Sequence, residues 1–392
     1  MEASVYLKPR KEQSIERYHP WVFSGAIKRV EGDPQNGDVV TIRANKGRFL
    51  ARGVYAAGRI AVRILSFEDL EVNDELIFSR LKNAWQKREK LGIAGNPNTN
   101  IFRWVHAEGD HLPGLIIDVY GDTAVVVAHA LGMHNFAKSL ASKFTELSNG
   151  TIKNVFDKSA IALKKHGIEI ENSYLLGERS NAKLIENNVH FKVDWETGQK
   201  TGFFIDQREN RELLKRYSNE KTVVNTFCYT GGFSMYALQG GAKKVISVDS
   251  SASAMEMVEE NVAWNHFDDK KHESLKADVL DFVKDLPKNV DVIVLDPPAF
   301  AKHMSARHQA VQGYKRINFQ AIQQIRPGGI IFTFSCSQVI DTKLFRDTVM
   351  AAAINAKRNV RILHQLHQPP DHPINIYHPE GEYLKGLVLE VE

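Results

Sequence analysis

The chain has little of what marks secreted and membrane proteins. Two cysteines in 392 residues exclude a disulfide scaffold and a cysteine-rich zinc site. No apolar run approaches the roughly 18–20 residues of a membrane helix, and the best stretch, residues 124–133, contains His129. The first residues, MEASVYLKPRKEQ, are charged and have no apolar signal core. We therefore expect a cytoplasmic protein with no membrane partner.

The length and composition predict a globular protein with more than one domain. A chain of 392 residues exceeds the roughly 250–300 residues at which a single core stops growing. Hydrophobic residues make up 43% of the chain and charged residues 25%, so it can bury cores and is not disordered. We expect two or three domains.

The sequence pattern changes twice along the chain. Residues 1–70 contain short alternating segments separated by glycines, which predicts a β-rich domain. Residues 71–182 combine a helix over 73–91 with a hairpin over 114–130, which predicts a small α+β domain. Strands and helices alternate over residues 183–392, which predicts a doubly wound parallel sheet of the α/β class.

Within the α/β region, the spacing of apolar residues predicts helices over 313–325 and 342–356. The segments RNVRILHQL and YLKGLVLEV predict a final antiparallel pair of strands that closes the sheet. Asp206 with Glu209 matches a capping box, which predicts a helix that starts at this point.

Positive charge is concentrated at the start of the chain. The net charge is only +4, yet residues 1–66 contain twelve lysines and arginines against six acidic residues. Clustered cations gain free energy by releasing counterions from a nucleic acid, so this segment favours a phosphate-bearing partner. When charge is the only evidence, a solvated basic surface with no partner is an equally good interpretation.

Glycines and carboxylates follow the successive strands of the predicted parallel sheet. They are Tyr229, Gly231 and Gly232 after the first strand, Asp249 after the second, Asp278 after the third and Asp296 after the fourth. Ligands of such sheets bind at the carboxyl ends of the strands, so these residues are expected to surround one ligand. Either Asp249 or Asp278 alone would be interpreted as an ordinary helix N-cap.

The glycine pattern favours S-adenosylmethionine (SAM) as the cofactor over a dinucleotide. A dinucleotide requires G-x-G-x-x-G to seat its pyrophosphate on a helix N-terminus, and this chain has only the pair Gly231-Gly232. SAM has no phosphate to bind, so a looser glycine turn is sufficient. Asp296-Pro297-Pro298 is also typical of methyltransferases that act on bases.

A cysteine follows the next predicted strand, in the motif FSCS around Cys336. C5 of a pyrimidine is too weak a nucleophile to attack SAM unaided, and a thiolate that adds to C6 activates it. Cys336 is therefore predicted to be the nucleophile of a carbon methyltransferase. Cys228 lies beside the glycine turn and is interpreted as a packing residue. We expect no metal site, because His364, His367, His372 and His378 are irregularly spaced.

Seven motifs, in order along the chain, resemble those of the RlmI family of bacterial 23S rRNA cytosine-C5 methyltransferases. They are HPWVFSGAI, LPGLIIDVYGD, GQKTGFFIDQREN, YTGGF, LDPPAF, FSCS and HPEGEYLKG. The resemblance runs from about residue 5 to the C-terminus. It implies an N-terminal PUA barrel that binds RNA, a small α+β middle domain, and a Rossmann-like class I methyltransferase domain. The implied partner is 23S rRNA, and the implied assembly is a homodimer.

The resemblance also assigns roles to individual residues. Cys336 would be the nucleophile, and Asp296 would hold the edge of the cytosine. The implied cofactor-binding residues are Phe227, Tyr229, Gly231 and Gly232 at the methionine end, Asp249 at the ribose, Asp278 at the adenine and Gln207 at the near wall. Ala299 stands where some members have lysine, so a phosphate contact from that lysine does not transfer.

Two other functions remain open from the sequence. An rRNA base N-methyltransferase would use the DPP motif with a following aromatic residue, although here Ala299 stands between the motif and Phe300. A non-catalytic RNA-binding factor for ribosome assembly would not need Cys336 or the cofactor turn. The group that removes the C5 proton is not identified by any motif.

Overall fold

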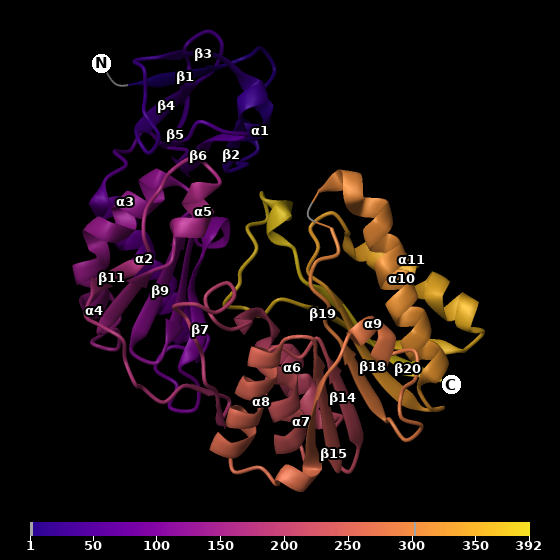
Figure 1. The fold of residues 1–392 in the computed structure, drawn as a ribbon. Coiled ribbons are helices and arrows are strands. Elements are labelled where there is room, and N and C mark those ends of the chain that lie inside the picture. Colours follow the sequence, from indigo (N-terminus) through magenta and orange to yellow (C-terminus); the bar gives the residue numbers. More distant parts are fainter. Residues whose placement is uncertain (1–2, 302) are drawn as a thin grey trace. The chain divides into compact units, whose positions relative to one another are not determined.

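The computed structural model describes residues 3–301 and 303–392 (Figure 1). Contacts divide the chain into two compact units, each made of several segments. Unit 1 comprises residues 1–185, 193–203 and 370–381, and unit 2 comprises residues 186–192, 204–369 and 382–392. Among the described residues, no helix has the length and apolar character needed to span a bilayer.

The N-terminal part of unit 1 is a six-stranded sheet in the order β2-β6-β5-β4-β1-β3. Its strands are β1 Ser4–Leu7, β2 Trp21–Phe23, β3 Ile27–Glu31, β4 Val39–Arg43, β5 Phe49–Tyr55 and β6 Ile60–Ser66, with the short helix α1 at Gln13–Glu16. The inward side chains of these strands, such as Val5, Val40 and Val62, form one buried cluster. The predicted β-rich start of the chain is confirmed.

The rest of unit 1 is a five-stranded sheet in the order β11-β10-β9-β8-β7 with helices. The elements are α2 Asp74–Lys90, β7 Ile101–His106, β8 Leu115–Tyr120, β9 Thr123–Ala128, α3 Leu131–Leu140, α4 Phe144–Leu147, β10 Asn154–Asp157, α5 Ala160–Lys164 and β11 Ser173–Leu176. Asn73 caps α2 by accepting a hydrogen bond from the amide of Leu76, and the chain turns at Gly92 with a φ of 68°. The predicted helix and the β8–β9 hairpin are confirmed.

Buried contacts join the segments of unit 1. Val54 and Leu65 of the six-stranded sheet pack into the core of the five-stranded sheet. Arg88 donates to both oxygens of Asp110 at 2.6 and 2.7 Å and to the carbonyl of Asp371 at 2.6 Å. Breaking a buried pair of this kind typically costs about 3–5 kcal/mol. Residues 370–381 are therefore firmly held within unit 1.

Unit 2 is built on a seven-stranded sheet in the order β16-β15-β14-β17-β18-β20-β19. Its strands are β14 Thr222–Thr226, β15 Lys244–Asp249, β16 His272–Lys276, β17 Val292–Leu295, β18 Gly329–Ser335, β19 Val360–His367 and β20 Lys385–Val391. The first five are parallel, β20 runs antiparallel to β18, and β19 runs antiparallel to β20. The predicted parallel sheet and its final antiparallel pair are confirmed.

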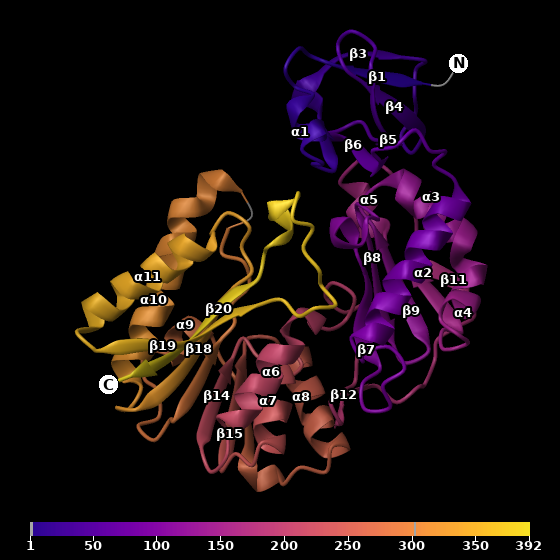
Figure 2. The same ribbon diagram turned by 180° about the vertical axis from the view of Figure 1, so that it is seen from behind.

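Helices cover both faces of this sheet, with α6, α7 and α8 on one face and α10 and α11 on the other (Figures 1 and 2). Their bounds are α6 Arg208–Arg216, α7 Gly232–Gln239, α8 Ala252–Trp264, α9 Val279–Phe282, α10 Arg307–Gln324 and α11 Thr342–Ala356. A short two-stranded sheet, β12 Ile185–Glu186 and β13 Val189–His190, precedes them.

Two predicted details of the helices are wrong. Helix α10 begins at Arg307, six residues before the predicted start, and no side chain caps it. The capping box at Asp206 does not form, because residues 205–207 make a turn of 3₁₀ helix before α6 begins at Arg208. Asp206 instead accepts a hydrogen bond from the hydroxyl of Tyr383 at 2.8 Å. A distant tertiary partner thus replaces the local cap.

Candidate functional site

The loop after β14 has an unusual backbone. Phe227, Tyr229 and Gly231 have φ angles of 52°, 47° and 80°. Bulky residues rarely adopt this left-handed conformation, which costs roughly 1–3 kcal/mol for each residue and persists only where the surroundings hold it. Such strain clusters at ligand-binding sites, so this loop is a candidate site on backbone geometry alone.

Asp249, at the end of β15, holds the strained loop in place. Its carboxylate accepts a hydrogen bond from the amide of Tyr229 at 3.0 Å and another from the amide of Ser251 at 3.0 Å. The side chain of Asn261 donates to the carbonyl of Thr230 at 2.9 Å. Each carboxylate oxygen can accept a second hydrogen bond, so this loop contact leaves capacity for a ribose hydroxyl.

Packing and backbone geometry both require a glycine at the start of α7. Gly231 is the N-cap residue of α7, and a Cβ atom there would lie 3.1 Å from a methyl carbon of Val258. Its φ of 80° would strain any other residue as well. The roles of Gly231 and Gly232 toward the cofactor remain predictions.

Asp278 caps a helix. Its Oδ1 atom accepts a hydrogen bond from the amide of Asp281 at 3.1 Å, at the start of α9. The side chain is exposed at the carboxyl end of β16. Its assignment to the adenine remains a prediction.

Gln207 and Asp296 are brought together from 89 residues apart. The side-chain nitrogen of Gln207 donates to Oδ2 of Asp296 at 3.0 Å, and its oxygen accepts from Asn210 at 2.6 Å. Gln207 is only 3% exposed, so both ends of its amide are fixed inside the protein. Gln207 therefore orients the carboxylate of the DPP motif, and its assignment to the wall of the cofactor pocket remains a prediction.

Cys336 lies directly after β18, at the same edge of the sheet, and is partly exposed. Two buried groups fix the turn that follows it. Ser337 donates its hydroxyl to the carbonyl of Ala301 at 2.7 Å, and the Lys385 ammonium donates to the carbonyls of Ser337 and Ile340, both at 2.8 Å.

Tyr314 of α10 is fully buried. Burial raises the pKa of Tyr314 to about 12, so its hydroxyl stays protonated at neutral pH. The sequence analysis assigned no role to Tyr314 or to Lys385, although Lys385 lies in the motif HPEGEYLKG.

Cys228 has a different environment from Cys336. It is 6% exposed, and burial together with the nearby Asp249 carboxylate raises the pKa of its thiol well above the ordinary value. Since the thiolate is the nucleophilic form, these surroundings keep Cys228 unreactive.

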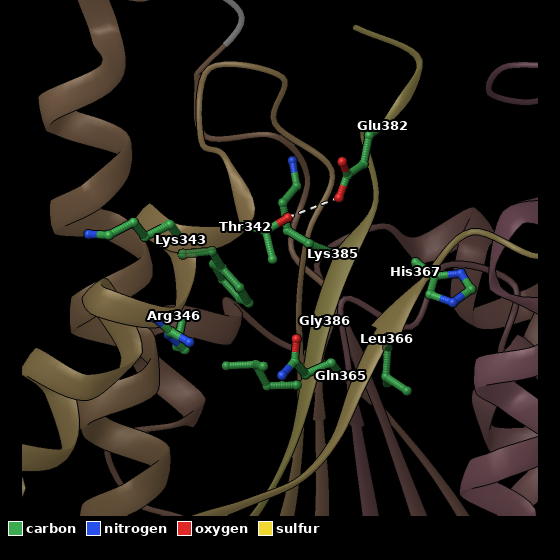
Figure 3. Close-up of a pocket in the computed structure, with 11 residues that line it drawn as sticks. Thr342, Lys343, Arg346, Gln365, Leu366, His367, Glu382, Lys385 and Gly386 are labelled. Atoms are coloured by element: carbon green, nitrogen blue, oxygen red, sulfur yellow. Dashed lines mark hydrogen bonds between the residues drawn. The ribbon is translucent and has the colours of Figure 1, made fainter. Parts of the chain in front are cut away.

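A pocket of about 400 Å³ lies between α11 and the ends of β19 and β20, where Lys385 forms part of its wall (Figure 3). The side chain of Thr342 donates to Glu382 across its mouth at 3.1 Å. Its lining residues are Thr342, Lys343, Phe345, Arg346, Gln365, Leu366, His367, Glu382, Lys385, Gly386 and Leu387. Sequence reasoning did not identify this pocket.

The four C-terminal histidines have separate partners. His364 contacts the hydroxyl of Tyr217 at 2.8 Å, and His372 contacts Asp371 at 3.1 Å. In residues 3–301 and 303–392, no group of three or more His, Cys, Asp or Glu side chains is placed to hold a metal ion.

Family models match both ends of this architecture. Residues 5–67 match a PUA-like domain, and residues 164–387 match an S-adenosylmethionine-dependent methyltransferase. A candidate SAM-dependent methyltransferase from Streptococcus mutans has the same fold, with a TM-score of 0.84, 21% identity and full coverage of both chains. A second candidate methyltransferase, crystallised with SAH, matches with a TM-score of 0.85, also with 21% identity and full coverage of both chains. The fold and the site thus define a class I methyltransferase with a PUA-like domain and SAM as its cofactor.

Curated relatives identify the family within that class. The chain is 38% identical to ribosomal RNA large subunit methyltransferase I of Alteromonas mediterranea, covering 100% of this chain and 99% of the relative. It is 40% identical to the protein of that name from Shewanella denitrificans, covering 100% of both. The chain belongs to the ribosomal RNA large subunit methyltransferase I family. The resemblance seen in the motifs is confirmed.

Proposed function

We propose that this methyltransferase modifies C5 of a cytosine in 23S rRNA, with Cys336 as the nucleophile. The observation that carries the proposal is the position of a partly exposed thiol directly after β18, at the sheet edge where Asp296 follows the neighbouring parallel strand β17. The names of the relatives, which specify large-subunit ribosomal RNA, support the RNA substrate.

The residues of the site suit SAM. The strained loop at Phe227 and Tyr229, the left-handed turn at Gly231 and the carboxylate of Asp249 would hold it. When bound, SAM supplies an electrophilic methyl group on a positively charged sulfur. The loop and the carboxylate lie at the carboxyl ends of neighbouring strands, as cofactor sites of this sheet type require.

The chain's own side chains activate the base. The thiolate of Cys336 adds to C6, and the electrons of the C5–C6 double bond move through C5 and C4 toward N3. Asp296, held by Gln207, would bind the N3 edge and give its proton to N3 as negative charge develops there. Once C5 carries the methyl group, loss of the C5 proton to a base restores the double bond and releases the Cys336 thiolate, and N3 returns its proton to Asp296. The C–S bond formed in the first step is thus broken in the last.

The basic N-terminal region completes the proposal. Its excess of cations and its PUA-like family match support RNA binding by this part of the chain. A homodimer also stays a prediction, which sedimentation of the purified protein would test.

Two measurements test the proposed chemistry together. Nucleosides from 23S rRNA labelled with tritiated SAM should contain 5-methylcytidine. RNA carrying 5-fluorocytidine should form a SAM-dependent adduct that survives denaturation, because fluorine cannot leave C5 as a proton does. The adduct should form with wild type and with Cys228→Ala, but not with Cys336→Ala. An N-methylated nucleoside without an adduct would instead support amine methylation, and no methylated nucleoside would support an assembly role.

A further inference from the structure

The most exposed aromatic side chains of the chain gather in one part of unit 1. Tyr18 and Tyr377 are each 51% exposed and Phe23 is 37% exposed, and no other phenylalanine, tyrosine or tryptophan in residues 3–301 and 303–392 reaches that level. The ring centroids of Tyr18 and Tyr377 lie 5.2 Å apart, although the two residues come from opposite ends of the chain. A contiguous group of exposed apolar side chains, unlike a single one, marks an interaction surface.

Further rings connect Phe23 with this pair. The ring of His19, the residue after Tyr18, lies 6.0 Å from that of Phe23 and 5.7 Å from that of His378, the residue after Tyr377. Ile376, on the other side of Tyr377, is 85% exposed. We call Tyr18, Phe23, Ile376 and Tyr377 the aromatic surface.

Hydrogen bonds fix residues 370–381 beside the N-terminal sheet. Asn375 donates its side-chain amide to the carbonyl of Glu108 at 3.3 Å, and its side-chain oxygen accepts from the amide of Tyr377 at 3.0 Å. The carboxylate of Glu108 accepts from the indole of Trp21, in β2, at 2.8 Å. The aromatic surface is therefore ordered before a ligand arrives, which lowers the entropic cost of binding.

Tyr18 has a strained backbone. Its φ is 61°, in the left-handed region, where a chain leaving a helix such as α1 usually has glycine. Its ring lies 5.2 Å from the rings of both Phe67 and Tyr377. Bulky residues keep such a conformation mainly where a function requires the side chain at that place.

Unpaired cations surround the aromatic surface. Arg17 precedes Tyr18, and the carbonyl of Arg59 accepts from the amide of Ser24, the residue after Phe23, at 3.0 Å. Lys11 lies in the same loop as Tyr18, where its carbonyl accepts from the hydroxyl of Ser14 at 3.3 Å. The side chains of Lys11, Arg17 and Arg59 are exposed and form no ion pair with any residue that the structure describes.

The nearby carboxylates do not cancel this charge. Glu16 pairs with Arg48, and Glu380 lies 3.5 Å from a ring nitrogen of His19. Glu12, beside Lys11, is partly buried. The surface thus combines flat rings with an excess of free cations.

Unpaired nucleotides of RNA have the matching chemistry. Every base has a flat π-face that stacks on an aromatic side chain, and every nucleotide has a phosphate that attracts lysine and arginine. In a duplex the bases stack on one another, so their faces are not available to the protein. A protein partner could also cover exposed rings, but the free cations favour a polyanion.

We propose that the aromatic surface stacks unpaired bases of the RNA substrate, so that the enzyme binds a single-stranded segment in preference to a duplex. Residues 370–381, although late in the chain, then form part of the RNA-binding surface together with the PUA-like domain. The inference rests on the proposed RNA substrate and not on the role of Cys336.

Two RNA probes test the proposal with the full-length protein in the absence of SAM. One is oligouridylate, whose bases are unpaired, and the other is a blunt RNA duplex; fluorescence anisotropy gives both affinities. Tyr377→Leu keeps an apolar side chain but removes the π-face. It should weaken binding of oligouridylate roughly five- to a hundredfold and leave binding of the duplex unchanged. Tyr377→Phe keeps the ring and should match wild type on both probes.

Ile161 provides the matched control. It is 71% exposed on α5, in the same unit, and Ile161→Ala should leave both affinities unchanged. The slope of log affinity against log salt should also stay the same in Tyr377→Leu, because no phosphate contact is lost, whereas Arg17→Gln should reduce it by about 0.7 on the single strand.

The outcomes separate this inference from the proposed function. An equal loss on both probes in Tyr377→Leu would indicate damage to the domain, and no loss on either would leave the surface to a protein partner; each result would overturn the proposal. If wild type binds neither probe, the proposed RNA substrate fails as well. Because the assay measures no methyl transfer, failure of the Cys336 chemistry would not change its result.

Discussion

The two cysteines occupy comparable places in the sheet but different surroundings. Cys228 follows β14 by two residues, is buried and lies beside the Asp249 carboxylate, so the pKa of its thiol is raised well above normal. Cys336 follows β18 directly and is partly exposed. The difference teaches that the strand end alone does not make a nucleophile. The thiol must also be accessible, and its surroundings must not disfavour the thiolate.

The largest effect should come from removing Cys336 itself. Cys336→Ala should lower methyl transfer by roughly three to six orders of magnitude, as removal of a covalent nucleophile does in other enzymes. Cys228→Ala should stay close to wild type, because its thiol serves packing only. Single-turnover methylation of rRNA with saturating SAM measures both. Equal losses of methyl transfer in the two variants would contradict the assignment of Cys336, and not Cys228, as the nucleophile.

Asp296 should give the next largest effect. Asp296→Asn keeps the size of the side chain and a partner for Gln207, but it removes the carboxylate that would face the base. Turnover should fall by about 10²- to 10⁴-fold, the usual share of acid–base catalysis. Calorimetry should show that SAM binding is retained. A matching loss of SAM affinity would place Asp296 at the cofactor instead.

Substitution of Asp249 should weaken the binding of SAM without removing the nucleophile. Asp249→Ala removes the acceptor for the amide of Tyr229 and the predicted acceptor for the ribose, so we expect the dissociation constant of SAM to rise about ten- to a hundredfold. Asp249→Asn keeps one acceptor oxygen and should lose less. Wild-type affinity of the alanine variant in calorimetry would show that this carboxylate serves the loop alone.

The smallest effects are expected in the basic N-terminal region, which belongs to a different unit from both cysteines. Arg10, Lys11 and Arg17 are exposed and suit substitution by glutamine. The slope of log affinity for RNA against log salt should fall by about 2–3, since each lost phosphate contact reduces it by about 0.7–0.9. A control at Lys82 and Lys90, exposed on α2, should leave the slope unchanged. Point changes are preferable to deleting the sheet, whose β5 and β6 pack into the core of unit 1.

Local sequence signals predicted most of the framework. The helix predicted over residues 73–91 corresponds to α2 because helical periodicity depends on residues that are neighbours in the chain. The alternation of strands and helices is also a local pattern in the sequence, and it indicated the parallel sheet. The site was predicted where it follows strand ends, as at Cys336 and Asp249, because parallel strands bring their carboxyl ends to one edge.

The remaining parts of the site depend on contacts that no local pattern encodes. Lys385 reaches Ser337 and Ile340 only because β20 inserts antiparallel beside β18. Asp206 looked like a helix cap, but the hydroxyl of Tyr383, 177 residues away, binds it. In both cases a residue from β20 or the segment just before it bonds to a residue much earlier in the chain, and this contact determines the local structure. An analysis of neighbours in sequence cannot detect such partners.

The insertion of β20 between β18 and β19 has a consequence for synthesis. Lys385 leaves the ribosome almost 50 residues after Cys336, and residues 370–381, which bind Arg88 in unit 1, emerge only shortly before it. A growing chain that already displays the cofactor turn therefore still lacks the strand that joins β19 to the rest of its sheet. We expect the turn after Cys336 to be fixed by Lys385 only when this last strand has been made and paired.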